Sequence, residues 1–213
     1  MSNPVLENIR RSLGRSEQSP LSARPAILTP RQPNSVDSEI ASFLDEIRKL
    51  SGVGQEFPPA ETESALKNLV AEQNIKKATV WNTALLKQLG IADHLIALGV
   101  KLVSPNADKH TIAECDLGVT EADFILPETG TIILRSSAEK PRAVSLVPRV
   151  HLAIVTPSSL RVDMHQVFSE SKHSNYLVFI TGPSRTADIE LTVTLGVHGP
   201  KNLYVWVMNN KNG

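Results

Sequence analysis

One stretch of the chain combines groups that bind anions in many α/β proteins. Residues 179–190, FITGPSRTADIE, predict a strand, a Gly-Pro turn and then a helix that begins near Ser184. Free backbone N–H groups at such a helix end, together with the guanidinium of Arg185, suit a carboxylate or a phosphate. The same pattern is also compatible with a plain helix cap, in which a hydroxyl caps the helix, Asp188 or Glu190 lies in its first turn, and Arg185 pairs with one of these acids. The ligand-binding candidates here are Thr181, Gly182, Ser184, Arg185 and Thr186.

A second candidate is the carboxylate of Glu128. Two apolar runs flank the tetrapeptide Pro-Glu-Thr-Gly at residues 127–130, which is typical of a β-hairpin. A carboxylate beside hydroxyls at a tight turn could act as a nucleophile or general base, which makes Glu128 the candidate catalytic residue. These residue types are also ordinary turn formers, so a solvated turn explains them equally. Thr129 and Gly130 join the ligand-binding candidates.

Two of the six histidines hold positions that suit a site. His151 begins a predicted strand, and His198 lies in a Gly-Val-His-Gly-Pro turn before the last predicted strand. Both are ligand-binding candidates, although a lone histidine is also often structural. No HxH, HExxH or HxxxH spacing occurs, so no metal site is expected.

Other motifs of cofactor enzymes are missing from the sequence. There is neither a dinucleotide fingerprint, nor a GxxxxGK[ST] loop, nor a GxSxG nucleophile elbow, so no cofactor is expected. The single cysteine, Cys115, cannot by itself hold a Cys-rich zinc site or an iron–sulfur cluster. Acidic neighbours would raise its thiol pKa, which favours a passive role.

Composition narrows the class of protein. Twenty-two basic and 22 acidic residues give a formal net charge of zero over 213 residues, which does not favour a nucleic-acid binder. The first 15 residues carry charges where a secretory signal needs an apolar core, and no apolar run reaches the roughly 18 residues of a membrane span. We therefore expect a cytoplasmic protein without a membrane span.

The candidate residues must be positioned by the elements around them. Residues 1–14 predict an amphipathic helix, residues 15–36 a Pro-rich linker, and residues 37–213 one α/β domain. Residues 1–35 carry five Arg and two Glu. We expect this basic, tethered helix to dock on its own domain or on a partner subunit.

Short apolar strands alternating with helices predict a mostly parallel central sheet. The expected strands are residues 78–81, 100–103, 123–126, 131–135, 151–155, 176–180 and 203–208. The expected helices are residues 36–47, 61–70, 83–89, 158–169 and 186–195.

Five segments in order resemble the LUD-domain family, and within it the lactate utilization protein C subgroup. They are residues 118–123 (GVTEAD), 128–131 (ETGT), 146–151 (LVPRVH), 181–190 (TGPSRTADIE) and 195–200 (LGVHGP). Glu121 and Pro127 depart from the usual family pattern, which has glycine and a small residue there.

The resemblance implies the fold of ribose-5-phosphate isomerase, glucosamine-6-phosphate deaminase and the coenzyme A transferases. It also implies a role in bacterial oxidation of L-lactate to pyruvate, beside a separate oxidase-like subunit and a separate iron–sulfur subunit.

Three functions are then open. The first is a non-redox subunit of such a system that binds a small anion, such as a carboxylate, or a partner subunit. The second is a free-standing enzyme on a phosphorylated sugar or an acyl or coenzyme A-type substrate, with Glu128 as base or nucleophile and Arg185 as anchor. The third is a binding module without turnover. The sequence leaves open whether the chain is an enzyme.

Overall fold

The computed structural model describes residues 4–15, 31–172, 174, 176–187, 193–196 and 198–209. The chain divides into two compact units, Met1–Pro30 and Arg31–Gly213. The first contains helix α1 (Pro4–Ser12), as the sequence predicts, with Val5, Leu6 and Ile9 at least half exposed. The sheets and the other helices belong to the second unit.

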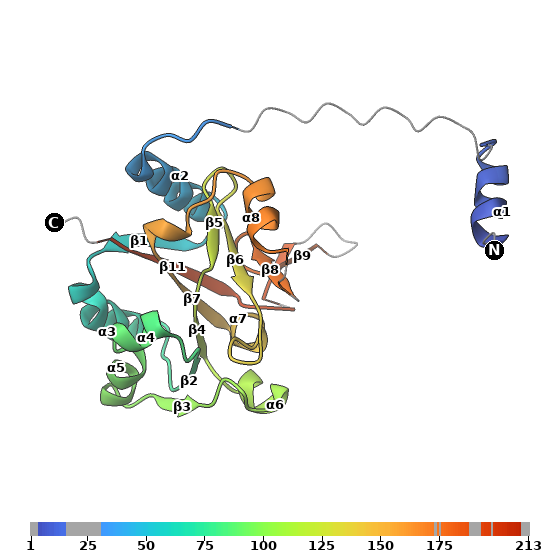
Figure 1. Cartoon of the computed structure of the whole chain (residues 1–213). Helices are drawn as coiled ribbons and strands as arrows, with labels where there is room; N and C mark the ends of the chain where they lie inside the picture. Colours follow the sequence, from blue (N-terminus) through green and yellow to red (C-terminus); the bar gives the residue numbers. More distant parts are fainter. Residues whose placement is uncertain are drawn as a thin grey trace. The chain divides into compact units, whose positions relative to one another are not determined.

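A six-stranded sheet forms the centre of this unit, and all its neighbouring strands are parallel (Figure 1). The strand order is β1 (Val53–Phe57), β11 (Asn202–Met208), β7 (Val150–Val155), β4 (Leu117–Glu121), β2 (Lys77–Val80) and β3 (Lys101–Val103). Every residue of β7 is buried, because both faces of a parallel sheet are covered. The predicted α/β class with a parallel central sheet is confirmed.

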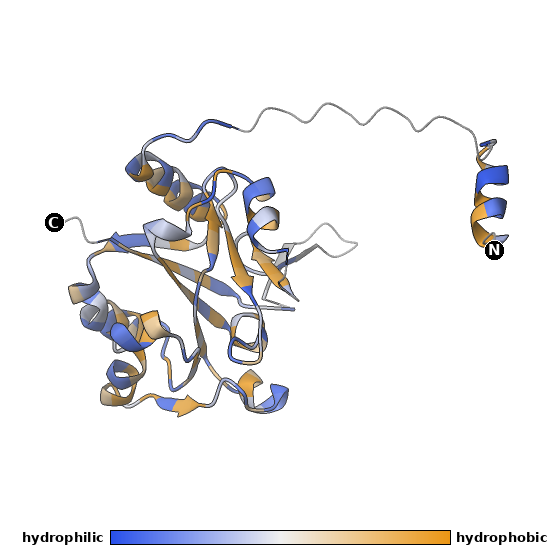
Figure 2. Ribbon diagram, in the orientation of Figure 1, coloured by the Kyte–Doolittle hydropathy of each residue, from blue (hydrophilic) through white to orange (hydrophobic). Residues whose placement is uncertain are grey.

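Helices cover the sheet on opposite sides (Figure 1). α2 (Val36–Lys49) and the short α7 (Ala143–Leu146) pack on one face, and α3 (Thr62–Glu72), α4 (Ala84–Gln88) and α5 (Ile91–Ala97) belong to the other. α2 mixes hydrophobic and hydrophilic residues along its length (Figure 2), and its buried apolar side chains are Ile40, Phe43, Leu44 and Ile47. The remaining helices are α6 (Lys109–Ala113), α8 (Met164–Glu170) and two single turns, η1 (Pro59–Glu61) and η2 (Pro157–Ser159).

Beside the central sheet lies a small antiparallel sheet of β5 (Phe124–Leu126), β6 (Thr131–Arg135) and β8 (Leu177–Ile180). The predicted hairpin is the β5–β6 pair. Its turn residue Gly130 has φ +60°, and a Cβ there would lie 2.9 Å from the Cβ of Glu46 on α2. Glycine therefore lets the hairpin tip approach α2 closely.

The helix predicted over residues 186–195 is wrong. β9 (Arg185–Ala187) and β10 (Val193–Leu195) form an antiparallel pair instead. Residues 185–195 hold several β-branched side chains, which favour strands over helices. The acids Asp188 and Glu190, expected in the first helical turn, lie outside the described residues.

The structure also differs from the sequence prediction in the start of one helix and in two additional strands. The helix expected over residues 158–169 is α8, which begins only after Asp163, whose carboxylate accepts a bond from the Gln166 N–H at 3.0 Å. β1 and β4 were not predicted, because Gly54 and Gly118 lower the strand signal. A Cβ at Gly118 would lie 1.9 Å from the Val144 carbonyl oxygen, so glycine is what allows α7 to pack on β4.

No helix among the described residues is long and apolar enough to cross a membrane.

Candidate functional site

The imidazole of His151 is fully buried near the start of β7. Its Nε2 lies 2.9 Å from the Thr120 hydroxyl on β4, which is also fully buried. Its Nδ1 has no hydrogen-bond partner among the described residues. Burial lowers the pKa of His151 to about 3, so the ring is neutral at pH 7. One ring nitrogen is therefore left uncommitted inside the protein.

His151 lines a cavity of about 190 Å³ that collects several of the predicted ligand-binding residues. The cavity lies where β7, the segment after β8 and the turn before β11 meet. Apolar residues of its wall include Leu146, Phe179 and Leu203. The predicted residues in it are His151, Thr181, Gly182, Ser184 and His198, of which Thr181 and His198 are exposed.

This cavity lies at the amino ends of the parallel strands. His151 is the second residue of β7, and His198 shortly precedes β11. A strand–turn–helix over residues 179–190 in a parallel sheet would place the site at the carboxyl edge of that sheet, and this expectation is wrong. The expected strand of residues 176–180 does not belong to the parallel sheet, because β8 pairs antiparallel with β6 in the small sheet.

Arg185 has a different environment from the one expected. Its guanidinium donates to the Leu50 carbonyl at 2.5 Å and to the Ser51 hydroxyl at 3.0 Å, just after α2. It is exposed and is not part of the cavity wall. The Ser184 N–H donates to the Pro200 carbonyl, and the Gly196 N–H donates to the Ser184 carbonyl, both at 2.9 Å. No helix begins here, so the predicted anion site at a helix end is absent from this junction; Thr186 lies in β9.

A row of hydroxyls connects the hairpin tip to the cavity. The hydroxyl oxygens of Thr129 and Thr131 are 2.7 Å apart, and those of Thr131 and Thr181 are 2.8 Å apart. Glu128 and Thr129 are exposed at the tip, in a hollow of about 460 Å³ that also includes Asp163. Thr181 lines both this hollow and the His151 cavity. Gly130 shapes the turn and lines neither.

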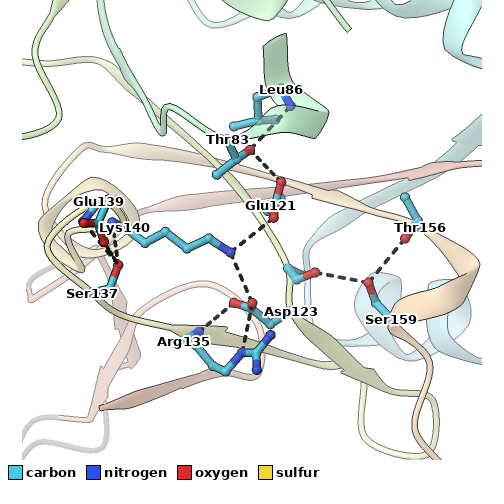
Figure 3. A network of polar contacts seen from close by, with 11 residues as sticks. Thr83, Leu86, Glu121, Asp123, Arg135, Ser137, Glu139, Lys140, Thr156 and Ser159 are labelled. Atoms are coloured by element: carbon cyan, nitrogen blue, oxygen red, sulfur yellow. Dashed lines mark hydrogen bonds and ion pairs between the residues drawn. The ribbon is translucent and has the colours of Figure 1, made fainter. Parts of the chain in front are cut away.

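At the opposite edge of the sheet, a charged network follows the carboxyl end of β4 (Figure 3). The Lys140 ammonium lies 3.1 Å from the Glu121 carboxylate and 3.2 Å from that of Asp123. Arg135 lies 3.1 Å from Asp123, and the Thr83 hydroxyl donates to Glu121 at 2.6 Å. Each charged group in the network thus has an opposite charge beside it.

Comparison with known proteins identifies the family of this chain. The family model of the LUD domain matches residues 40–208, most of the chain. The chain belongs to the LUD-domain family. The match includes Glu128, the hydroxyl row, His151 and His198, while α1 lies outside it.

Relatives of known name span nearly the whole length. "Lactate utilization protein C" of Halalkalibacterium halodurans is 28% identical over 211 residues, covering 92% of each chain. The protein of that name from Shouchella clausii is 29% identical over 223 residues, covering 97% of this chain and 96% of its own. The crystal structure of a DUF162 family protein from Deinococcus radiodurans superposes with a TM-score of 0.65 at 23% identity, covering 83% of this chain and all of that one. That structure supports the fold.

Within the LUD domain, sequence reasoning missed Thr120 and Ser145. Thr120 holds the His151 ring, and Ser145 lines the cavity while donating to the Arg142 carbonyl at 3.0 Å. Recognising residues 117–121 as a strand would have shown Gly118 and Thr120 on one face, because side chains alternate along a strand. Among the described residues, no group of three or more His, Cys, Asp or Glu is placed to hold a metal ion.

Proposed function

We propose that this chain is a non-redox component of a bacterial lactate-utilization system, located in the cytoplasm, that binds a small anion or a partner subunit. The observation that carries the proposal is the match to relatives named lactate utilization protein C over more than nine-tenths of both chains. The cavity of His151 supplies a place for a small ligand.

The assignment as non-redox rests on the sequence. A chain with one cysteine and no dinucleotide fingerprint lacks the usual means of holding an iron–sulfur cluster or a nicotinamide. Cys115 is buried, and burial raises the pKa of its thiol, which makes it a poor metal ligand. The proposed partners are therefore an iron–sulfur subunit and an oxidase-like subunit that carry the electrons. Purified full-length chain should show no visible absorption band and no stoichiometric iron.

Growth on lactate tests the proposal directly. A bacterium deleted for its own lactate utilization protein C should regain growth on L-lactate as sole carbon source when it expresses this chain. Growth on glucose serves as the control for general fitness. Affinity purification from the complemented strain should recover the iron–sulfur and oxidase-like proteins. Failure to restore growth, with the chain expressed and folded, would overturn the proposed role.

The N-terminal helix is the proposed docking element for a partner. α1 leaves Val5, Leu6 and Ile9 exposed in its own unit. Removing residues 1–30 should leave melting temperature unchanged and weaken partner recovery. Removing residues 1–35 is a different experiment, because Arg31 forms a two-bond ion pair at 2.7 and 2.8 Å with the buried carboxylate of Glu39. That longer deletion should lower the melting temperature as well.

A second candidate function rests on Glu128. Its hollow of about 460 Å³ includes Asp163 and three threonines, so a carboxylate there could take a proton from a bound substrate. In that case the chain is an enzyme on a phosphorylated sugar or an acyl or coenzyme A-type substrate. Glu128→Gln keeps the shape and removes the charge, so loss of growth on lactate in a folded variant would favour this second function.

A further inference from the structure

We propose that the chain forms a symmetric dimer in which β8 pairs antiparallel with β8 of a second copy, so that the two small sheets join into one. The dimer rests on the backbone groups at the edge of this strand, on the exposed aromatic side chains around it and on the charges at its two ends. It does not depend on the proposed function.

The outer edge of β8 has unpaired backbone groups. β8 is the last strand of the small sheet, with β6 on its other side (Figure 1). In the register of the two strands Arg135 is opposite Leu177, and the flanking residues Ser136 and Tyr176 share a backbone hydrogen bond of 3.0 Å. Leu177 therefore directs its N–H and C=O away from β6, and so does Phe179, because these directions alternate along a strand. Among the described residues, none of these four groups has a hydrogen-bond partner.

This edge also lacks the usual protection against another strand. Natural edge strands carry a charge, a proline or a bulge that blocks pairing, or are covered by another segment. The opposite edge of the small sheet is covered, because the Arg161 N–H donates to the Ile125 carbonyl on β5 at 2.9 Å. Residues 176–181, YLVFIT, contain neither a charge nor a proline, and Figure 2 shows β8 as hydrophobic along its length. Such an edge is a template for a further strand.

The exposed aromatic side chains of the described residues belong to the same region. They are Phe168 on α8, Phe179 on β8 and Tyr176 directly before β8. The rings of Phe168 and Phe179 lie 5.9 Å apart, and Met164 on α8 is also about half exposed. Exposed apolar groups that cluster together mark a surface for another protein, unlike single ones that are scattered. A second copy along β8 would cover part of this surface.

Symmetry favours a second copy as the occupant of the edge. An antiparallel pair of identical strands is self-complementary, so a two-fold axis at Val178 places Leu177 opposite the partner's Phe179 and the reverse. Each of these two residue pairs exchanges two hydrogen bonds. All the unpaired edge groups of Leu177 and Phe179 in both copies are then used.

The charges beside the two ends of β8 are opposite in sign. At its start, the Arg142 guanidinium stacks over the Tyr176 ring, 4.6 Å from the ring centroid. At its end, Thr181 lines the hollow that contains the carboxylates of Glu128 and Asp163. A two-fold antiparallel pair sets the start of one strand beside the end of the other, so the arginine of each copy approaches the acids of its partner. This charge complementarity favours the pairing of two copies.

The molar mass of the full-length chain in solution tests the proposal. We expect light scattering to give twice the mass of one chain. Phe179→Lys adds a charge to the edge and should raise the dissociation constant of the dimer roughly tenfold or more. Ile96→Lys is the matched control and should dimerise as wild type does, because Ile96 is also exposed and apolar but lies on α5. A monomeric wild-type chain, or a Phe179→Lys protein that dimerises as tightly as wild type, would overturn the proposal.

Cysteine cross-linking tests the register without adding a charge. Val178 lies directly opposite Val178 of the partner subunit, with Cα atoms roughly 4.5 Å apart, so Val178→Cys should form an intermolecular disulfide on oxidation. The two copies of Phe179 are diagonal, at roughly 7–8 Å, so Phe179→Cys should cross-link more slowly although its side chain is more exposed. Wild type is the control, because its one cysteine, Cys115, is buried. Equal or faster cross-linking of Phe179→Cys, or none in either variant, would overturn the proposed pairing.

Discussion

The two edges of the central sheet treat their polar groups in opposite ways. At the carboxyl edge, Lys140 lies between the carboxylates of Glu121 and Asp123, and Arg135 pairs with Asp123 again. At the amino edge, His151 lines a cavity while fully buried, and one of its ring nitrogens has no hydrogen-bond partner among the described residues. Ion pairs therefore hold the segments at the carboxyl edge together. The amino edge instead has a buried neutral histidine and a cavity that is large enough for a small ligand.

This contrast qualifies a general rule about α/β proteins. Ligands of open parallel sheets usually bind beyond the carboxyl ends of the strands. Here the network at that edge connects β4 to the segment around Lys140, as Figure 3 shows. Its charges neutralise one another, so they hold a loop in place, and the strongest ligand candidate lies at the other end of the sheet.

The largest effect should follow from closing the amino edge. Gly118→Ala places a Cβ within 1.9 Å of the Val144 carbonyl oxygen, so α7, which forms part of the cavity wall, must move. We expect the free energy of unfolding in urea to fall by about 3 kcal/mol or more, since backbone cannot yield as a side chain can. Gly54→Ala on β1 is the control and should cost less, because its added Cβ would meet the end of the Leu44 side chain at 2.9 Å and no backbone atom closer than 3.4 Å. A Gly118→Ala protein as stable as wild type would show that α7 is not held closely to β4.

Acid should destabilise the protein through the buried ring of His151. The pKa of His151 is about 3 in the fold against 6.5 in the unfolded chain, so the unfolded state takes up the proton first as pH falls below 6.5. Its contribution to stability is complete above that pH and is lost progressively toward pH 3. Between pH 7 and pH 5, wild type should lose about 2 kcal/mol that His151→Gln does not lose. Urea unfolding at both pH values measures this, and equal losses in the two proteins would contradict a neutral buried ring.

Breaking the charged network should have a smaller effect. Lys140→Met removes the partner of Glu121 and one partner of Asp123, whose side chain is only 4% exposed, while Arg135 still neutralises Asp123. We expect a loss of about 1–2 kcal/mol in unfolding free energy and no change in ligand affinity. The matched control is Lys49→Met, which breaks exposed pairs with Asp45 and Glu46 and should leave stability unchanged. If Lys140→Met abolished ligand binding, the carboxyl edge would be the site.

The smallest effect is expected at the hairpin tip. Glu128 is exposed, so Glu128→Gln should stay within about 0.5 kcal/mol of wild type. If the chain acts by binding alone, the variant should also restore growth on L-lactate at the wild-type rate. A folded Glu128→Gln protein that fails to restore growth would instead give the tip a catalytic role.

Local chemistry made part of this molecule predictable. The β5–β6 hairpin could be predicted because Pro127 and Gly130 favour a turn between the two apolar runs. The prediction failed for residues 186–195. This segment contains both possible helix-capping groups and β-branched side chains, and tertiary contacts decide whether it forms a helix or strands.

The sequence predicted individual residues of the site but not that they lie together. His151, Thr181 and His198 were chosen for their types and local positions, and the structure brings them into one cavity. Their meeting depends on β8 leaving the parallel sheet, which strand length and apolar content do not reveal. The sequence did not predict a role for Thr120, because Gly118 weakens the strand pattern of β4 and this strand was not predicted.

The row of Thr129, Thr131 and Thr181 gives the cavity a link to the outer surface. Either oxygen can donate in each of its two hydrogen bonds, so the row has two proton orders that run in opposite directions. A ligand that accepts a bond from Thr181 selects the order in which each hydroxyl donates inward, and Thr129 is then left as an acceptor at the tip. A ligand that donates to Thr181 selects the reverse. The surface 127–130 turn thus presents a different hydrogen-bonding face for each kind of ligand, without movement of the backbone.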